Sequence, residues 1–141
     1  MNSRDQLSRE IIAGGDQTPV HDNSSKCILS RGCDPDMGRR AMEFLPPLLG
    51  NPQVVSVTND DEFITALQRM KWSVVLFAPG ACRYDAIQAP IPGSRPQTHG
   101  WGLEDYRKLV RKHQGNQIQI IETTDESEIV PRLLKALRNI T

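Results

Sequence analysis

The chain has 141 residues, of which 17 are basic and 17 acidic, so its formal net charge is zero. One compact domain plus a tail fits this length, and the balanced charge gives no electrostatic reason to expect nucleic acid or an acidic membrane as the main partner. Hydrophobic residues make up only 38% of the chain, which indicates that part of it does not pack into a core.

The first 25 residues are polar and show no sustained apolar periodicity. Gly14-Gly15, Pro19 and the polar run at 22–25 are typical of loops and linkers. We therefore expect residues 1–25 to be a flexible tail and residues 26–141 to form a single domain.

From residue 26 onward, short apolar or β-branched runs alternate with segments of helical periodicity. Asp34 is a candidate helix N-cap with Pro35 at the first helical position, and Asn59 with Glu62 has capping-box spacing. Pro46-Pro47 should end or kink the first helix early, and Pro131 should make the last helix start late or kink. The predicted strands lie at 27–30, 53–58, 72–77 and 117–121, and a helix follows each.

This alternation predicts an α/β fold with a small, mainly parallel sheet of four or five strands and helices on both faces, as in flavodoxin-like proteins. Open sheets of this kind place functional groups at the carboxyl ends of their strands. The segments at those ends are 31–34, 58–60, 78–82 and 122–125.

The segment Ile28 to Arg40, ILSRGCDPDMGRR, resembles the opening strand and helix of bacterial receiver domains, the phosphorylated modules of response regulators. Val54 to Leu76 is similar to the next strand, helix and strand of that family. The segment Ile120 to Glu126 is similar to its fourth strand with the terminal Ser or Thr. The resemblance covers roughly residues 26 to 137 and implies the same fold.

The chemistry of the receiver family does not carry over to this chain. The positions that match the magnesium-binding acidic pair are Gly32 and Cys33, and Ala78 stands where the phosphorylated Asp should be. Alanine offers no nucleophile for an aspartyl-phosphate. Thr123 matches the residue that senses the phosphoryl group. The resemblance therefore implies a degenerate pocket formed by Gly32, Cys33, Ala78 and Thr123, in a pseudo-receiver that signals or binds a protein without phosphorylation.

The long loop at residues 78–102 is the other candidate site. Four prolines exclude a continuous helix there, and loops of this length are usually functional or disordered. Its ligand-competent side chains are Cys82, Arg83, Asp85, Arg95, His99 and Trp101. Cys82 is a candidate nucleophile, and Arg95 with His99 suits an anion, whereas Trp101 either stacks on a ligand or packs against the sheet. A small enzyme or ligand-binding protein is therefore the alternative function.

The basic run Arg107, Lys108, Arg111, Lys112 and His113 is typical of a solvated helix face, and Glu104 has the spacing to pair with Lys108. Three cysteines without metal-ligand spacing favour free thiols in a reducing cytosol. We find no P-loop, dinucleotide fingerprint, signal peptide or long apolar run. The sequence thus predicts a cytoplasmic protein with a protein partner, no metal, no cofactor and no membrane association.

Overall fold

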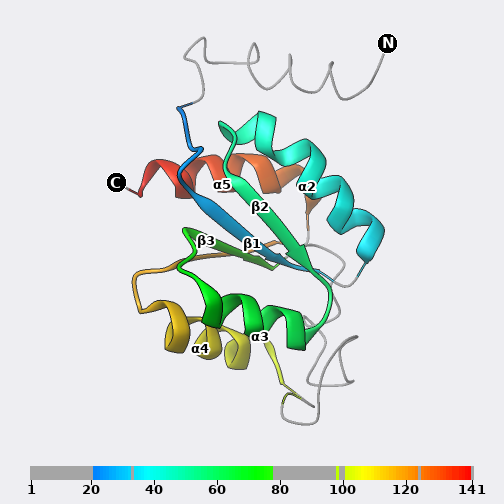
Figure 1. Cartoon of the computed structure of the whole chain (residues 1–141), viewed down its shortest axis with the longest axis vertical. Helices are drawn as coiled ribbons and strands as arrows, with labels where there is room; N and C mark the ends of the chain where they lie inside the picture. The colour runs from blue at the N-terminus through cyan, green and yellow to red at the C-terminus, as the bar shows by residue number, and fades with distance from the viewer. Residues whose placement is uncertain (1–20, 33, 78–97, 99–100, 124, 141) are drawn as a thin grey trace.

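The computed structural model describes residues 21–32, 34–77, 98, 101–123 and 125–140. Strands and helices alternate along them (Figure 1). The elements are β1 (Cys27–Arg31), α2 (Pro35–Leu49), β2 (Gln53–Val57), α3 (Asp60–Arg69), β3 (Val74–Phe77), α4 (Leu103–Gln114), β4 (Gln119–Glu122), the short 3₁₀ turn η3 (Glu126–Glu128) and α5 (Ile129–Arg138).

The described strands form one four-stranded sheet in the order β2-β1-β3-β4, and every neighbouring pair is parallel. This confirms the predicted α/β fold and the flavodoxin-like arrangement, in which the order reverses between β1 and β3. Because the strands are parallel, all four carboxyl ends meet at one edge of the sheet.

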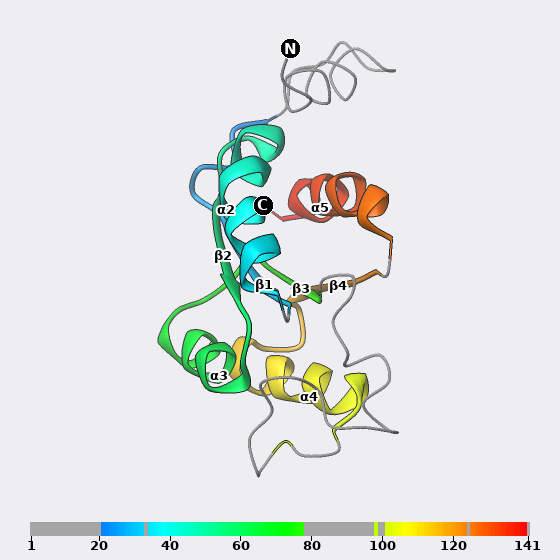
Figure 2. The same cartoon turned by 90° about the vertical axis from the view of Figure 1, so that its right-hand side faces the viewer.

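Helices cover both faces of the sheet, as Figure 2 shows. On one face α3 and α4 pack against a core that includes Leu29, Phe63 and Tyr106. On the other, α2 and α5 pack against a core that includes Ile28, Leu45 and Leu133. Adjacent residues of β1 pack into the cores on opposite faces of the sheet, which explains why the strand is apolar at successive positions.

The expected early end of the first helix is wrong. Helix α2 continues through Pro46 and Pro47 to Leu49, and Gly50 caps it in a left-handed conformation. Leu48 and Leu49 are buried in the final turn. Apolar packing of this turn offsets the missing backbone donors of the two prolines.

The last helix starts late, as the position of Pro131 predicts. Asp125 caps η3 rather than α5, and α5 begins only at Ile129. Pro131 then lies in the first helical turn, where its missing N–H has no intrahelical acceptor to lose. None of the described helices is long and apolar enough to cross a membrane.

Candidate functional site

Two oppositely charged side chains meet at the carboxyl edge of the sheet. Arg31 is the last residue of the interior strand β1 and lies in register with Val57 of β2 and Phe77 of β3. Asp60 is the first residue of α3, just after β2. The helix start is fixed by Asn59, whose side-chain oxygen accepts a hydrogen bond of 2.8 Å from the backbone N–H of Glu62. This N-cap, which the sequence predicts, sets Asp60 at the helix N-terminus.

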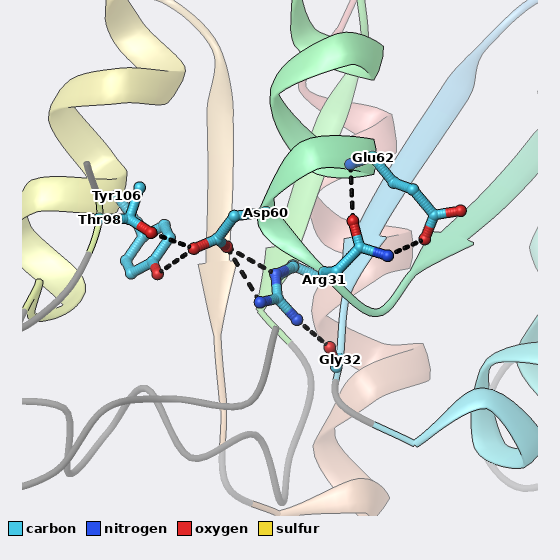
Figure 3. Close-up of polar contacts among 7 residues, drawn as sticks. Arg31, Gly32, Asp60, Glu62, Thr98 and Tyr106 are labelled. Carbon is cyan, nitrogen blue, oxygen red and sulfur yellow. Dashed lines mark hydrogen bonds and ion pairs between the residues drawn. The ribbon is translucent and has the colours of Figure 1, made fainter. Parts of the chain in front are cut away.

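The guanidinium of Arg31 and the carboxylate of Asp60 form a buried ion pair (Figure 3). Arg31 donates from Nε at 3.2 Å and from Nη2 at 2.9 Å to the same oxygen, Oδ1 of Asp60. The relative exposures of the two side chains are 1% and 0%. Arg31 also donates from Nη1 to the carbonyl oxygen of Gly32. Burial this complete costs desolvation energy, which only good geometry and further hydrogen bonds offset.

The second carboxylate oxygen of Asp60 accepts two hydroxyl hydrogen bonds. Thr98 donates to Oδ2 at 2.6 Å and Tyr106, from α4, donates at 2.8 Å. Both donors are buried. Burial, and secondarily the hydrogen bond and negative charge of Asp60, raise the pKa of the Tyr106 hydroxyl well above its usual range. Tyr106 therefore remains a neutral donor at physiological pH.

This cluster of Arg31, Asp60, Thr98 and Tyr106 joins β1, α3 and α4, together with Thr98 from the segment before α4. Both oxygens of Asp60 are used within the cluster, and its charge is compensated by Arg31. Such a carboxylate holds neighbouring elements in register and is poorly placed to accept a proton from a substrate or to bind a cation. Within the described ranges, no group of three or more His, Cys, Asp or Glu side chains is arranged to hold a metal ion.

The structure describes two of the four positions of the expected degenerate receiver pocket. The backbone N–H of Gly32 donates at 3.0 Å to the carbonyl oxygen of Val57. The hydroxyl of Thr123 accepts at 3.0 Å from the backbone N–H of Asp125, so it stabilises the turn that leads into η3. Cys33 and Ala78 lie outside the described residues.

Most of the loop candidates also lie outside the described residues, namely Cys82, Arg83, Asp85, Arg95 and His99. Trp101 is described, and it packs against the α3/α4 core. Its ring lies 5.3 Å from that of Tyr106 at an interplanar angle of 77°. This contact supports the packing role of Trp101 rather than stacking on a ligand.

A second ion pair joins α4 to the end of β4. Arg107 donates from Nε at 2.5 Å and from Nη2 at 2.7 Å to the two oxygens of Glu122, and from Nη1 at 2.8 Å to Glu104. The hydrogen bonds to Glu122, and then those to Glu104, raise the pKa of Arg107. The expectation that this basic run is entirely a solvated face is thus wrong at Arg107, and Glu104 pairs with Arg107, one residue before the expected Lys108.

The sequence pattern located the segments of the buried cluster but not its pairing. Arg31 and Asp60 belong to two of the four strand-end segments that the fold predicts, whereas Tyr106 lies in α4, outside those segments. A charged residue that ends an apolar interior strand is the signal for Arg31, because such a charge must find a partner. Nothing in the local pattern points to Thr98, which lies between β3 and α4 in the sequence.

No family model matches the chain, and searches of curated proteins and of solved structures find no significant match either.

Proposed function

We propose that this chain is a non-catalytic signalling or protein-interaction module of the cytoplasm, with a receiver-like architecture that works without phosphorylation. The observation that carries the proposal is the buried pairing of Arg31 with Asp60 at the carboxyl edge of the sheet. Open α/β sheets place reactive and ligand-binding groups at this edge. Here these two charges neutralise each other out of contact with solvent.

A phosphoryl switch needs accessible carboxylates to hold Mg²⁺, because that cation takes oxygen ligands in near-octahedral geometry. At the described positions that match the receiver pocket, the chain offers Gly32 and Thr123. The nearby carboxylate of Asp60 is already hydrogen-bonded at both oxygens. The surfaces of the domain, rather than a reaction centre, are then what it presents to a partner.

Incubation of the full chain with acetyl phosphate and Mg²⁺, followed at once by intact-mass spectrometry, tests this proposal. We expect no added phosphoryl group, whereas an authentic receiver domain treated in parallel should become modified. A phospho-adduct on this chain would contradict the proposal.

The alternative is a small enzyme or ligand-binding protein that uses the loop at 78–102. One observation favours it, since Thr98 brings the end of this loop to the buried Asp60 at the sheet edge. Cys82 is the candidate nucleophile, and its thiolate would need a lowered pKa. Thiol labelling across a pH series is the test: titration near the ordinary thiol pKa of about 8.5 would remove the support for a catalytic cysteine.

A further inference from the structure

Strand β4 is an outermost strand, so one of its sides forms a lateral edge of the described sheet. Among the described residues it pairs with β3 alone. On its other side, alternate residues present backbone N–H and C=O groups that have no strand partner in the described part of the chain. An open edge of this kind is a template on which another extended chain can pair.

A groove of about 520 Å³ runs along this edge, between β4 and one face of α5. Its lining residues are Gln119, Ile120, Ile121, Glu122, Arg132, Lys135, Ala136 and Asn139. The strand residues supply the backbone ladder, while Ile121 and Ala136 supply an apolar base. The helix residues recur at helical spacing, so α5 forms one continuous wall.

Ion pairs compensate two of the three charged side chains that line the groove, which leaves Lys135 as its uncompensated positive charge. The carboxylate of Glu122 is compensated by Arg107 from the opposite face of the sheet. Arg132 pairs with Glu128 at 2.9 Å and also donates to the carbonyl oxygen of Glu122. Lys135 makes no ion pair or hydrogen bond within the described residues, so its ammonium is available to a ligand.

We infer that the β4 edge binds an extended acidic segment of another protein, which adds to the sheet as a fifth strand. This inference rests on the proposed interaction function and names its partner class. Main-chain hydrogen bonds to β4 would supply affinity, and side chains of the added strand would alternate between the two faces of the sheet. Carboxylates on the α5 face would then lie beside Lys135 and Arg132, which supplies specificity.

Charge disfavours two other candidates for pairing with β4, namely a second copy of this chain and a segment of the chain itself. Two copies of the chain paired antiparallel through β4 would bring the basic faces of their α5 helices together, and like charges facing each other oppose association. Neither of the segments 1–20 and 78–97 is strongly acidic in sequence, since the first has two basic and three acidic side chains and the second has two basic and one acidic. An acidic segment from another protein fits the groove better.

The probe for this site is a capped peptide of about eight residues that alternates valine with glutamate, a length typical of strands. It is titrated into the isotopically labelled full chain, and backbone amide shifts are followed by NMR. We expect saturable shifts at Gln119–Glu122 and little change in β2, the opposite edge strand. A valine–lysine peptide and a peptide N-methylated at alternate residues should each bind at least about tenfold more weakly.

Charge reversal of the groove supplies the matched protein variants. Lys135→Glu should weaken binding of the acidic peptide about tenfold, whereas Arg40→Glu on the exposed face of α2 should leave it unchanged. Equal binding of the acidic and basic peptides, or shifts centred on β2, would overturn the inference. So would protection, in the unliganded chain, of the β4 amides that point away from β3, which would mean that this chain or a second copy already covers the edge.

Different experimental results would contradict the strand-addition site and the non-phosphorylated interaction function. An absence of binding at millimolar peptide, with no phosphorylation by acetyl phosphate, would overturn the strand-addition site but leave the interaction function. A phospho-adduct would overturn the non-phosphorylated module whatever the peptide does.

Discussion

The guanidinium of Arg31 donates two hydrogen bonds to one oxygen of Asp60, at 3.2 and 2.9 Å, and neither side chain is appreciably exposed. An isolated buried pair often contributes little net stability, because desolvation of both charges cancels the attraction. Here Tyr106 and Thr98 satisfy the other oxygen. The cluster thereby fixes the positions of β1, α3 and α4 relative to one another.

Asp60→Asn should strongly destabilise the fold. The substitution keeps the size of the side chain but leaves the Arg31 guanidinium buried without a counter-charge, so the free energy of unfolding should fall by about 3–5 kcal/mol. Urea denaturation followed by circular dichroism measures the change. Asp36→Asn is the matched control, since Asp36 also lies in the first turn of a helix but forms an exposed pair with Arg39. This control should change stability little; equal losses for both variants would contradict the role of burial.

Tyr106→Phe should lower the free energy of unfolding at neutral pH by about 1.5–3 kcal/mol, since it removes a hydrogen bond to a charged acceptor. The ring contacts with Phe63, Phe77 and Trp101 remain. Urea denaturation measures this loss as well. A loss too small to measure would show that the hydroxyl of Tyr106 is not coupled to Asp60.

The same hydroxyl should make the stability of the chain fall in alkali. The folded-state pKa of Tyr106 is raised, mainly by burial, above its ordinary value of 10.0. Above about pH 10 the unfolded chain therefore binds fewer protons than the folded chain, and the free energy of unfolding decreases as pH rises. This contribution approaches about 1.4 kcal/mol per pH unit for one proton. Denaturation curves between pH 9 and 12 should show a steeper decline for the natural chain than for Tyr106→Phe; parallel curves would contradict the raised pKa.

The strand and helix pattern was predictable because each element satisfies a local rule. The run Val74–Phe77 has the continuous apolar character of an interior parallel strand, and Asn59 begins its helix as its side-chain chemistry dictates. The end of α2 was not predictable in this way. Its two prolines favour an early stop, but tertiary burial of Leu48 and Leu49 overrides that preference. A local sequence window contains no information about such distant packing.

The location of the candidate site was predictable from the sequence, but its side-chain contacts were not. The fold assigns the strand ends to one edge, which brings Arg31 and Asp60 into the same region. Their pairing depends on side-chain direction and on the position of α4, which carries Tyr106. The hydroxyl that donates to Asp60 belongs to Thr98, which lies 38 positions away in the sequence. Contacts of this kind have no periodicity from which they could be predicted.

The pair formed by Arg107 and Glu122 should contribute measurable coupling between α4 and β4. Both side chains are partly buried, with exposures of 32% and 22%, and the geometry is bidentate. A double-mutant cycle with alanine at each position should give a coupling of about 1 kcal/mol, reduced in high salt because the pair is partly exposed. The exposed pair of Arg39 and Asp36 is the control and should show almost no coupling. Similar coupling for the two pairs would mean that bidentate geometry and partial burial add nothing.

Gly50 and Gly115 both require glycine, but for different reasons. Gly50 is left-handed, with φ 84° and ψ 28°. Gly115 has φ 92° and ψ 167°, a region that is essentially restricted to glycine. A Cβ atom at Gly50 would lie 2.0 Å from the backbone oxygen of His21, whereas one at Gly115 would meet nothing within 4 Å. The backbone at Gly50 cannot move away freely, because its carbonyl oxygen accepts a hydrogen bond of 2.8 Å from the N–H of Asn23.

Alanine at the two glycines should therefore destabilise the fold by different routes. Gly115→Ala should cost about 1–3 kcal/mol through backbone strain alone. Gly50→Ala should cost about 1–2 kcal/mol for the left-handed conformation plus about 1–3 kcal/mol, because the segment at His21 and Asn23 must be displaced. Urea denaturation of both variants measures the difference. Hydrogen exchange at the amide of Asn23 should also accelerate in Gly50→Ala alone, since displacement of His21 weakens the adjacent hydrogen bond. Unchanged exchange at Asn23 in Gly50→Ala would show that the segment before β1 yields without resistance and does not hold the end of α2.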